Sequence, residues 1–107
     1  MTALPEIIAN YFSLPANASI PELGLILAED AVVRDERRAH QGLRAIRHWR
    51  IDTMTRTPFQ LRPLDVEDRD GTVVVRTQIS GAFPGSPVVL DHHFTLRNDR
   101  IAALEIV

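Results

Sequence analysis

Residues 88–97 read VVLDHHFTLR and have the pattern of a β-strand. Apolar residues alternate with mostly polar ones along it, which is the period of a β-strand with one buried face. His92 falls on the apolar face, so a polar ring is expected among core side chains. The inward set is Val88, Leu90, His92, Phe94 and Leu96, and the outward set is Val89, Asp91, His93, Thr95 and Arg97.

Further strands are predicted on both sides of this stretch, over residues 60–68, 73–83 and 100–107. Asp70-Gly71 is a strong hairpin signal, and turn residues also fill 84–87 and 98–99. Pro63 cannot donate a ladder hydrogen bond, so its strand is expected at a sheet edge or at a bulge. The inward set of the 73–83 strand is Val73, Val75, Thr77, Ile79, Gly81 and Phe83. In the last strand the assignment is ambiguous, and one option faces Ala102, Leu104 and Ile106 inward.

The residues before these strands favour helices. A first helix is predicted where apolar side chains recur with helical spacing, at Leu4, Ile7, Ile8, Tyr11 and Phe12. Ser19 and Glu22 have the spacing of a capping box that starts a second helix. A short strand is predicted over 31–35, and Gly42 opens a third helix that contains Trp49. Helices followed by a meander of strands predict one α+β domain over 1–107, with helices on one face of an antiparallel sheet.

The composition excludes several functional classes. The 107 residues carry a net charge of −2, which gives no electrostatic basis for nucleic-acid binding. The chain has no cysteine, so disulfides and thiolate zinc sites are excluded. Residues 1–6 lack a basic segment and a long apolar run, so we expect no signal peptide, no membrane span and a cytoplasmic location. Adjacent histidines at 92 and 93 point to opposite faces, and we expect no metal and no cofactor.

These patterns together resemble the nuclear transport factor 2-like superfamily, in particular its SnoaL-like branch. The resemblance covers nearly the whole chain and is carried by residues 27–36 (LAEDAVVRDE), 42–49 (GLRAIRHW), 91–96 (DHHFTL) and 100–101 (RI). It implies a cone-shaped barrel, in which a curved, mostly antiparallel sheet wraps around three N-terminal helices. It also implies a pocket at the wide end of the cone. The superfamily hosts isomerases, cyclases, binding modules and adaptors, so it specifies the fold better than the function.

The resemblance to ketosteroid isomerases within this superfamily implies three candidate catalytic residues. Tyr11 matches the tyrosine on the first helix, and Asp35 matches the base at the end of the first strand. His92 falls where those enzymes carry a second acid, which is a departure from the pattern. Polyketide cyclases of the SnoaL type use an aspartate near the end of the last strand, where this chain has Ile106.

Each candidate also has an alternative that the residues alone leave open. Tyr11 lies on an apolar helical stripe and could be core. Asp35 could cap a loop or pair with a nearby arginine, and His92 could be a satisfied pocket wall. The remaining candidates for the pocket wall are apolar or aromatic: Trp49, Phe12, Val75, Phe83, Leu90 and Phe94.

Three functions follow as hypotheses. The first is binding of a small apolar molecule within the cone. The second is an isomerase or cyclase that moves a proton beside a carbonyl, with Asp35 as base and Tyr11 as oxyanion donor. The third is a non-catalytic scaffold. In each case the resemblance implies a homodimer through the convex face of the sheet.

Overall fold

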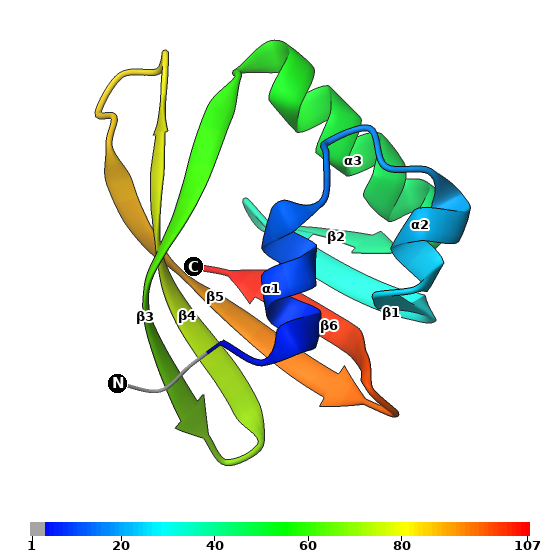
Figure 1. Cartoon of the computed structure of the whole chain (residues 1–107). Helices are drawn as coiled ribbons and strands as arrows, with labels where there is room; N and C mark the ends of the chain where they lie inside the picture. Colours follow the sequence, from blue (N-terminus) through cyan, green and yellow to red (C-terminus); the bar gives the residue numbers. More distant parts are fainter. Residues whose placement is uncertain (1–3) are drawn as a thin grey trace.

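The computed structural model describes residues 4–107, so the first three residues of the N-terminal segment considered above lie outside the described residues. A curved sheet wraps around one side of three helices, as Figure 1 shows. The sheet has the strand order β2-β1-β6-β5-β4-β3, and the pairing of β1 with β6 is parallel whereas the other pairings are antiparallel. The prediction of an α+β cone is therefore confirmed. The elements are α1 (Glu6–Ser13), α2 (Ile20–Gly24), β1 (Leu27–Asp35), β2 (Arg38–Gln41), α3 (Leu43–Arg56), β3 (Phe59–Arg69), β4 (Thr72–Gly81), β5 (Val88–Arg97) and β6 (Arg100–Ile106).

The helices begin where local chemistry favours a start. The Ser19 hydroxyl accepts from the Glu22 backbone N–H at 3.2 Å, and the Glu22 carboxylate accepts from the Ser19 N–H at 2.9 Å. This is the predicted capping box, and it satisfies two backbone donors that the helix leaves open. α3 follows Gly42, whose φ of 88° lies in the left-handed region that glycine adopts without strain.

The β3–β4 hairpin follows the turn chemistry of the sequence. Asp70 and Gly71 have φ values of 51° and 85°, as a two-residue turn of type I′ requires. β3 is an edge strand, and its pairing with β4 slips between Pro63 and Asp65, so both readings of Pro63 are confirmed. Gly81 ends β4 at a close approach, because a Cβ there would lie 2.4 Å from the Pro58 carbonyl oxygen.

The structure differs from the predicted strands in three places. β1 begins at Leu27 and not at residue 31, because an irregularity between Leu27 and Val32 interrupts the alternation of buried and exposed residues. β2 was not predicted, since its four residues are mostly exposed and show no clear period. In β6 the buried residues are Ile101 and Leu104, because a register shift between Thr95 and Leu96 of β5 breaks the simple alternation.

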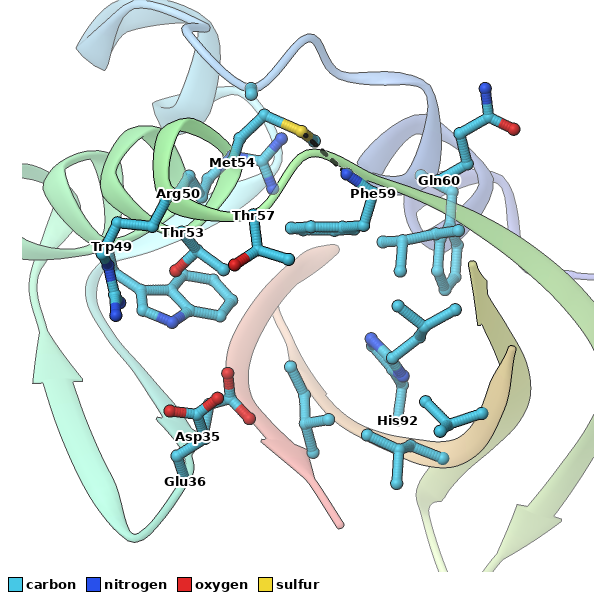
Figure 2. Close-up of a pocket in the computed structure, with 18 of the residues that line it drawn as sticks. Asp35, Glu36, Trp49, Arg50, Thr53, Met54, Thr57, Phe59, Gln60 and His92 are labelled. Atoms are coloured by element: carbon cyan, nitrogen blue, oxygen red, sulfur yellow. Dashed lines mark hydrogen bonds between the residues drawn. The ribbon is translucent and has the colours of Figure 1, made fainter. Parts of the chain in front are cut away.

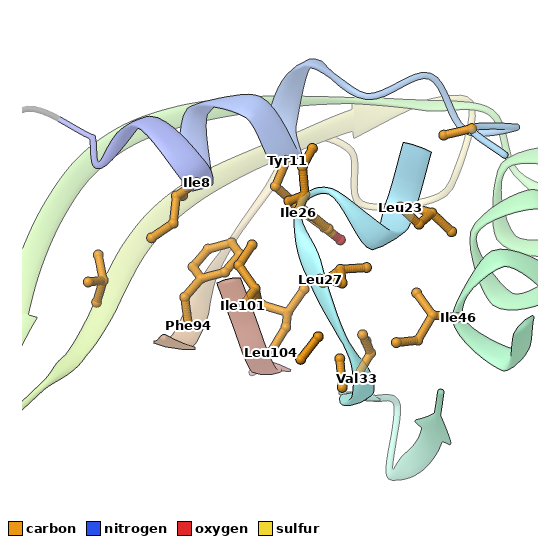
Figure 3. Packing of buried hydrophobic residues seen from close by; sticks show 14 of the residues in the cluster. Ile8, Tyr11, Leu23, Ile26, Leu27, Val33, Ile46, Phe94, Ile101 and Leu104 are labelled. Carbon is orange, nitrogen blue, oxygen red and sulfur yellow. The ribbon is translucent and has the colours of Figure 1, made fainter. Parts of the chain in front are cut away.

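The core lies between the helices and the concave face of the sheet, as Figure 3 shows. Each helix contributes a fully buried side chain, namely Ile8, Leu23 and Ile46. They belong to one cluster with sheet residues that include Phe94 and Leu104. Burying such side chains stabilises a fold by roughly 1.5–3 kcal/mol each. In the described part of the chain, no helix is long and apolar enough to cross a bilayer.

Candidate functional site

A cavity of about 720 Å³ opens beside the core, between α3 and the concave sides of β3, β4 and β5. Figure 2 shows it from close by. Of the predicted site residues, seven line the cavity: Tyr11, Phe12, Asp35, Trp49, Phe83, Leu90 and His92. Val75 and Phe94 do not, because both are fully buried in the core. The wall is mainly apolar, as is usual for a small-molecule site, and charged side chains that include Glu36, Arg50 and Arg56 also line it.

Asp35 ends β1 at the mouth of this cavity and is half-buried. Burial raises the pKa of its carboxyl, and the neighbouring Glu36 charge raises it further, whereas hydrogen bonds from the Trp49 side chain and the Glu36 backbone lower it. The chain then turns sharply, with φ values of 50° at Glu36 and 66° at Arg37. Within residues 4–107 no arginine forms an ion pair with Asp35.

Trp49 also lines the cavity near Asp35, and His40 packs against it. The His40 ring stacks on its indole, with ring centroids 5.6 Å apart and planes inclined by 27°. The charge of His40 also lowers the pKa of Asp35. The contact of His40 with Trp49 was not predicted, because β2, the strand that carries His40, was not predicted.

Tyr11 lies deeper, with its side chain almost fully buried. Its ring meets Phe12 and Phe94 edge-on, at centroid distances of 5.7 and 5.5 Å. Burial raises the pKa of the phenol, while the charge of Arg50 and a hydrogen bond from it act in the opposite direction. The guanidinium carbon of Arg50 stands 5.1 Å from the centre of the Tyr11 ring.

Arg50 is a cavity residue that the sequence analysis missed. Its Nη2 donates to the carbonyl oxygens of Leu14 and Pro15 at 3.3 and 3.2 Å, which ties α3 to the end of α1. A usable signal was present, because Arg50 falls four residues after Ile46 and shares its face of the helix.

His92 points from β5 into the cavity and is 1% exposed. Its Nδ1 is buried without a partner in the described part of the chain. Burial lowers the pKa of the imidazole from 6.5 to about 4, so the ring is neutral near pH 7. A neutral imidazole has one N–H donor and one acceptor nitrogen. Phe12 and Phe94 flank the ring at 5.7 and 6.2 Å between centroids.

The polar groups therefore fall into two separate clusters. Asp35, Trp49 and His40 form the mouth cluster, and Tyr11 and His92 belong to an aromatic cluster deeper in the cone. β6 lies between β1 and β5, and its Ile106 pairs with His92. Two strand spacings separate β1 from β5, about 10 Å at the backbone. A small molecule between the clusters can meet a carboxylate on one side and neutral hydrogen-bonding groups on the other.

Comparisons of the whole chain with known proteins find several of similar fold. No family model matches the chain, and no curated protein matches it significantly. A protein from Sinorhizobium meliloti, described as a candidate polyketide cyclase, is 38% identical over 97% of this chain and 95% of its own, with a TM-score of 0.89. A SnoaL-like polyketide cyclase candidate from Jannaschia has a TM-score of 0.76 at 16% identity, covering 95% of this chain and 82% of its own. A protein with a ketosteroid isomerase-like fold from Catenulispora acidiphila, in complex with trimethylamine, has a TM-score of 0.78 at 17% identity, covering 98% and 86%.

Proposed function

Because this chain belongs to the SnoaL-like branch of the nuclear transport factor 2-like superfamily, we propose that its cone binds a small, largely apolar molecule. The cavity itself carries this proposal. Its volume of about 720 Å³ lies within the usual range for ligand sites, and its wall consists mainly of aromatic and aliphatic side chains. Leu90 and Phe83 offer apolar contact, whereas Tyr11 and His92 offer hydrogen bonds that fix orientation.

A second candidate function is proton transfer beside a carbonyl, as in an isomerase or cyclase. The observation that favours it is Asp35, a carboxylate whose pKa is raised by burial at the edge of an apolar cavity. Such a group is a better general base near neutral pH than an ordinary aspartate. In this reaction Asp35 takes the proton, and the Tyr11 hydroxyl and the His92 N–H donate to the enolate oxygen. Ile106 leaves no carboxylate at the cyclase position, so chemistry that depends on an acid there is not part of the proposal.

Calorimetric titration with 2-naphthol tests the binding function, because this planar phenol fills an aromatic cavity and carries one hydroxyl. We expect saturable binding to the wild type and about tenfold weaker binding to Tyr11→Phe, which keeps the ring packing and loses one hydrogen bond. His48→Gln is the matched control, since His48 is exposed on α3 and does not line the cavity. Absence of saturable binding by 2-naphthol and by 2-acetylnaphthalene, a ketone of similar size, would contradict the proposed function.

A further inference from the structure

Among the described residues, no carboxylate forms an ion pair with the Arg50 guanidinium. The side chain is half-buried and lines the cavity. Within residues 4–107 the ion pairs are those of Arg56, Arg69 and Arg97, so no carboxylate neutralises Arg50. Charges taken out of water are normally paired, because their desolvation is expensive. This charge is therefore held by backbone carbonyls and by the face of the Tyr11 ring, with no carboxylate to neutralise it.

The hydrogen bonds of Arg50 also leave capacity unused. Both backbone carbonyls are bound through the same nitrogen, Nη2, at 3.3 and 3.2 Å. Nε is buried and has no partner among the described residues. A guanidinium has several further N–H donors. Because Arg50 lines the cavity, its positive charge is close to any ligand that is bound there.

Asp35, the carboxylate of the mouth cluster, does not pair with this charge. The pKa of Asp35 responds to burial, Glu36, Trp49 and His40, and Arg50 is not among its influences. Arg50 acts on Tyr11 instead, 5.1 Å from the ring centre, where it offsets part of the effect of burial on the phenol. The phenol and the guanidinium thus form one corner of the cavity, in which Arg50 supplies a positive charge.

We propose that the ligand is an apolar carboxylic acid in its ionised form, whose carboxylate lies against Arg50 and the Tyr11 hydroxyl. This inference rests on the proposed binding function and adds the chemical class of the ligand. The apolar body of the acid occupies the space between Leu90, Phe83 and Trp49. The carboxylate supplies the negative counter-charge for Arg50 and accepts charge-assisted hydrogen bonds from its guanidinium.

The alternative is that Arg50 only clamps the segment after α1 to α3. The chain offers a matched control for this role in Arg47, on the same helix. Its Nε donates to the carbonyl oxygen of Ala18 at 3.0 Å, so it clamps the same connecting segment. Arg47 does not line the cavity. If Arg50 only clamps this segment, variants of Arg47 and Arg50 should change ligand binding alike. If Arg50 binds the ligand carboxylate, only the Arg50 variant should lose the preference for a charged ligand.

The experiment compares 2-naphthoate with 2-naphthamide, which have nearly the same shape and differ in charge. Dissociation constants are measured by calorimetry at about pH 7.5 for the wild type, Arg50→Gln and Arg47→Gln. We expect the wild type to prefer the carboxylate about tenfold. The preference should vanish in Arg50→Gln and persist in Arg47→Gln. Equal affinities in the wild type, or an unchanged preference in Arg50→Gln, would overturn the inference.

Two further measurements keep the outcome decisive. If circular dichroism shows that Arg50→Gln does not fold, Arg50→Lys replaces it. Because lysine keeps the positive charge, this variant should still prefer 2-naphthoate to 2-naphthamide. In the wild type, the preference for 2-naphthoate should shrink as salt is raised, and a preference that salt leaves unchanged counts against an ion pair. Binding of 2-naphthamide as tight as that of 2-naphthoate overturns the ligand class alone. Failure of both compounds to bind contradicts the binding function as well.

Discussion

Replacing His92 by phenylalanine should remove a defined part of the acid sensitivity of this protein. The imidazole is 1% exposed, its Nδ1 has no partner within residues 4–107, and burial lowers its pKa to about 4. In the unfolded chain the same group titrates near 6.5. Between pH 6.5 and about 4, His92 is protonated in the unfolded state but stays neutral in the folded state. Stability should therefore fall as the pH drops from 6.5 towards 4, and His92 should contribute no further loss below that.

The size of the effect follows from the two pKa values. A difference between 6.5 and about 4 corresponds to about 3.4 kcal/mol when the titration is complete. By about pH 4.5 roughly 2.5 kcal/mol of this has been lost, and at about pH 7.5 almost none. The raised pKa of Asp35 acts in the opposite direction, since protonation then favours the folded state. Because Asp35 is present in both proteins, its contribution cancels when wild type and variant are compared.

Urea unfolding at about pH 7.5 and about pH 4.5 measures the free energy of unfolding of both proteins without adding salt. Between the two pH values the wild type should lose about 2.5 kcal/mol more than His92→Phe. The control is His93→Phe, which makes the same change at the neighbouring position on the opposite face of β5. Equal losses in the wild type and in His92→Phe would refute the assignment of a neutral, desolvated imidazole.

Two further predictions concern the turn and the base. Replacing Glu36 and Arg37 by Asn and Gly should raise the free energy of unfolding by about 1 kcal/mol, since Asn-Gly suits their left-handed conformation; an unchanged thermal midpoint would argue against strain there. If the protein catalyses proton transfer, Asp35→Asn should slow deuterium exchange beside the carbonyl of 2-acetylnaphthalene, followed by NMR, by about two to four orders of magnitude. Equal exchange rates in wild type and variant would exclude Asp35 as the base.

Much of the fold could be predicted from local patterns. The residues of β5 were assigned correctly because its period is regular, and the α2 capping box and the Asp70-Gly71 turn depend on short-range chemistry alone. Local patterns did not predict the long-range pairing of β1 with β6. β1 pairs with β6 through an irregular register, so Leu27 joins the sheet despite the exposed acids that follow it.

The candidate site was harder to predict. Alternation shows which side chains of a strand point inward, but it does not show which of them reach the core and which reach the cavity. On β5 the inward residues pass from Phe94 in the core, through His92, to Leu90 on the cavity wall. Val75 and Phe94 were assigned to the cavity for this reason, although the core encloses them. Arg50 was missed because a charged residue on a helix is normally solvated. Its spacing from Ile46 indicates the inward face of the helix, and the tertiary structure shows that this face borders the cavity at Arg50.

The place of β6 in the sheet has a consequence for how the chain is made. β6 is the strand through which the β1–β2 pair joins β5, β4 and β3. Its partner β1 lies far upstream, so closing the cone requires a contact between distant parts of the chain, which slows folding. During synthesis, the edges of β1 and β5 stay open to other chains until residues 100–106 leave the ribosome. Molecular chaperones would therefore matter most to this protein before β6 has joined the sheet.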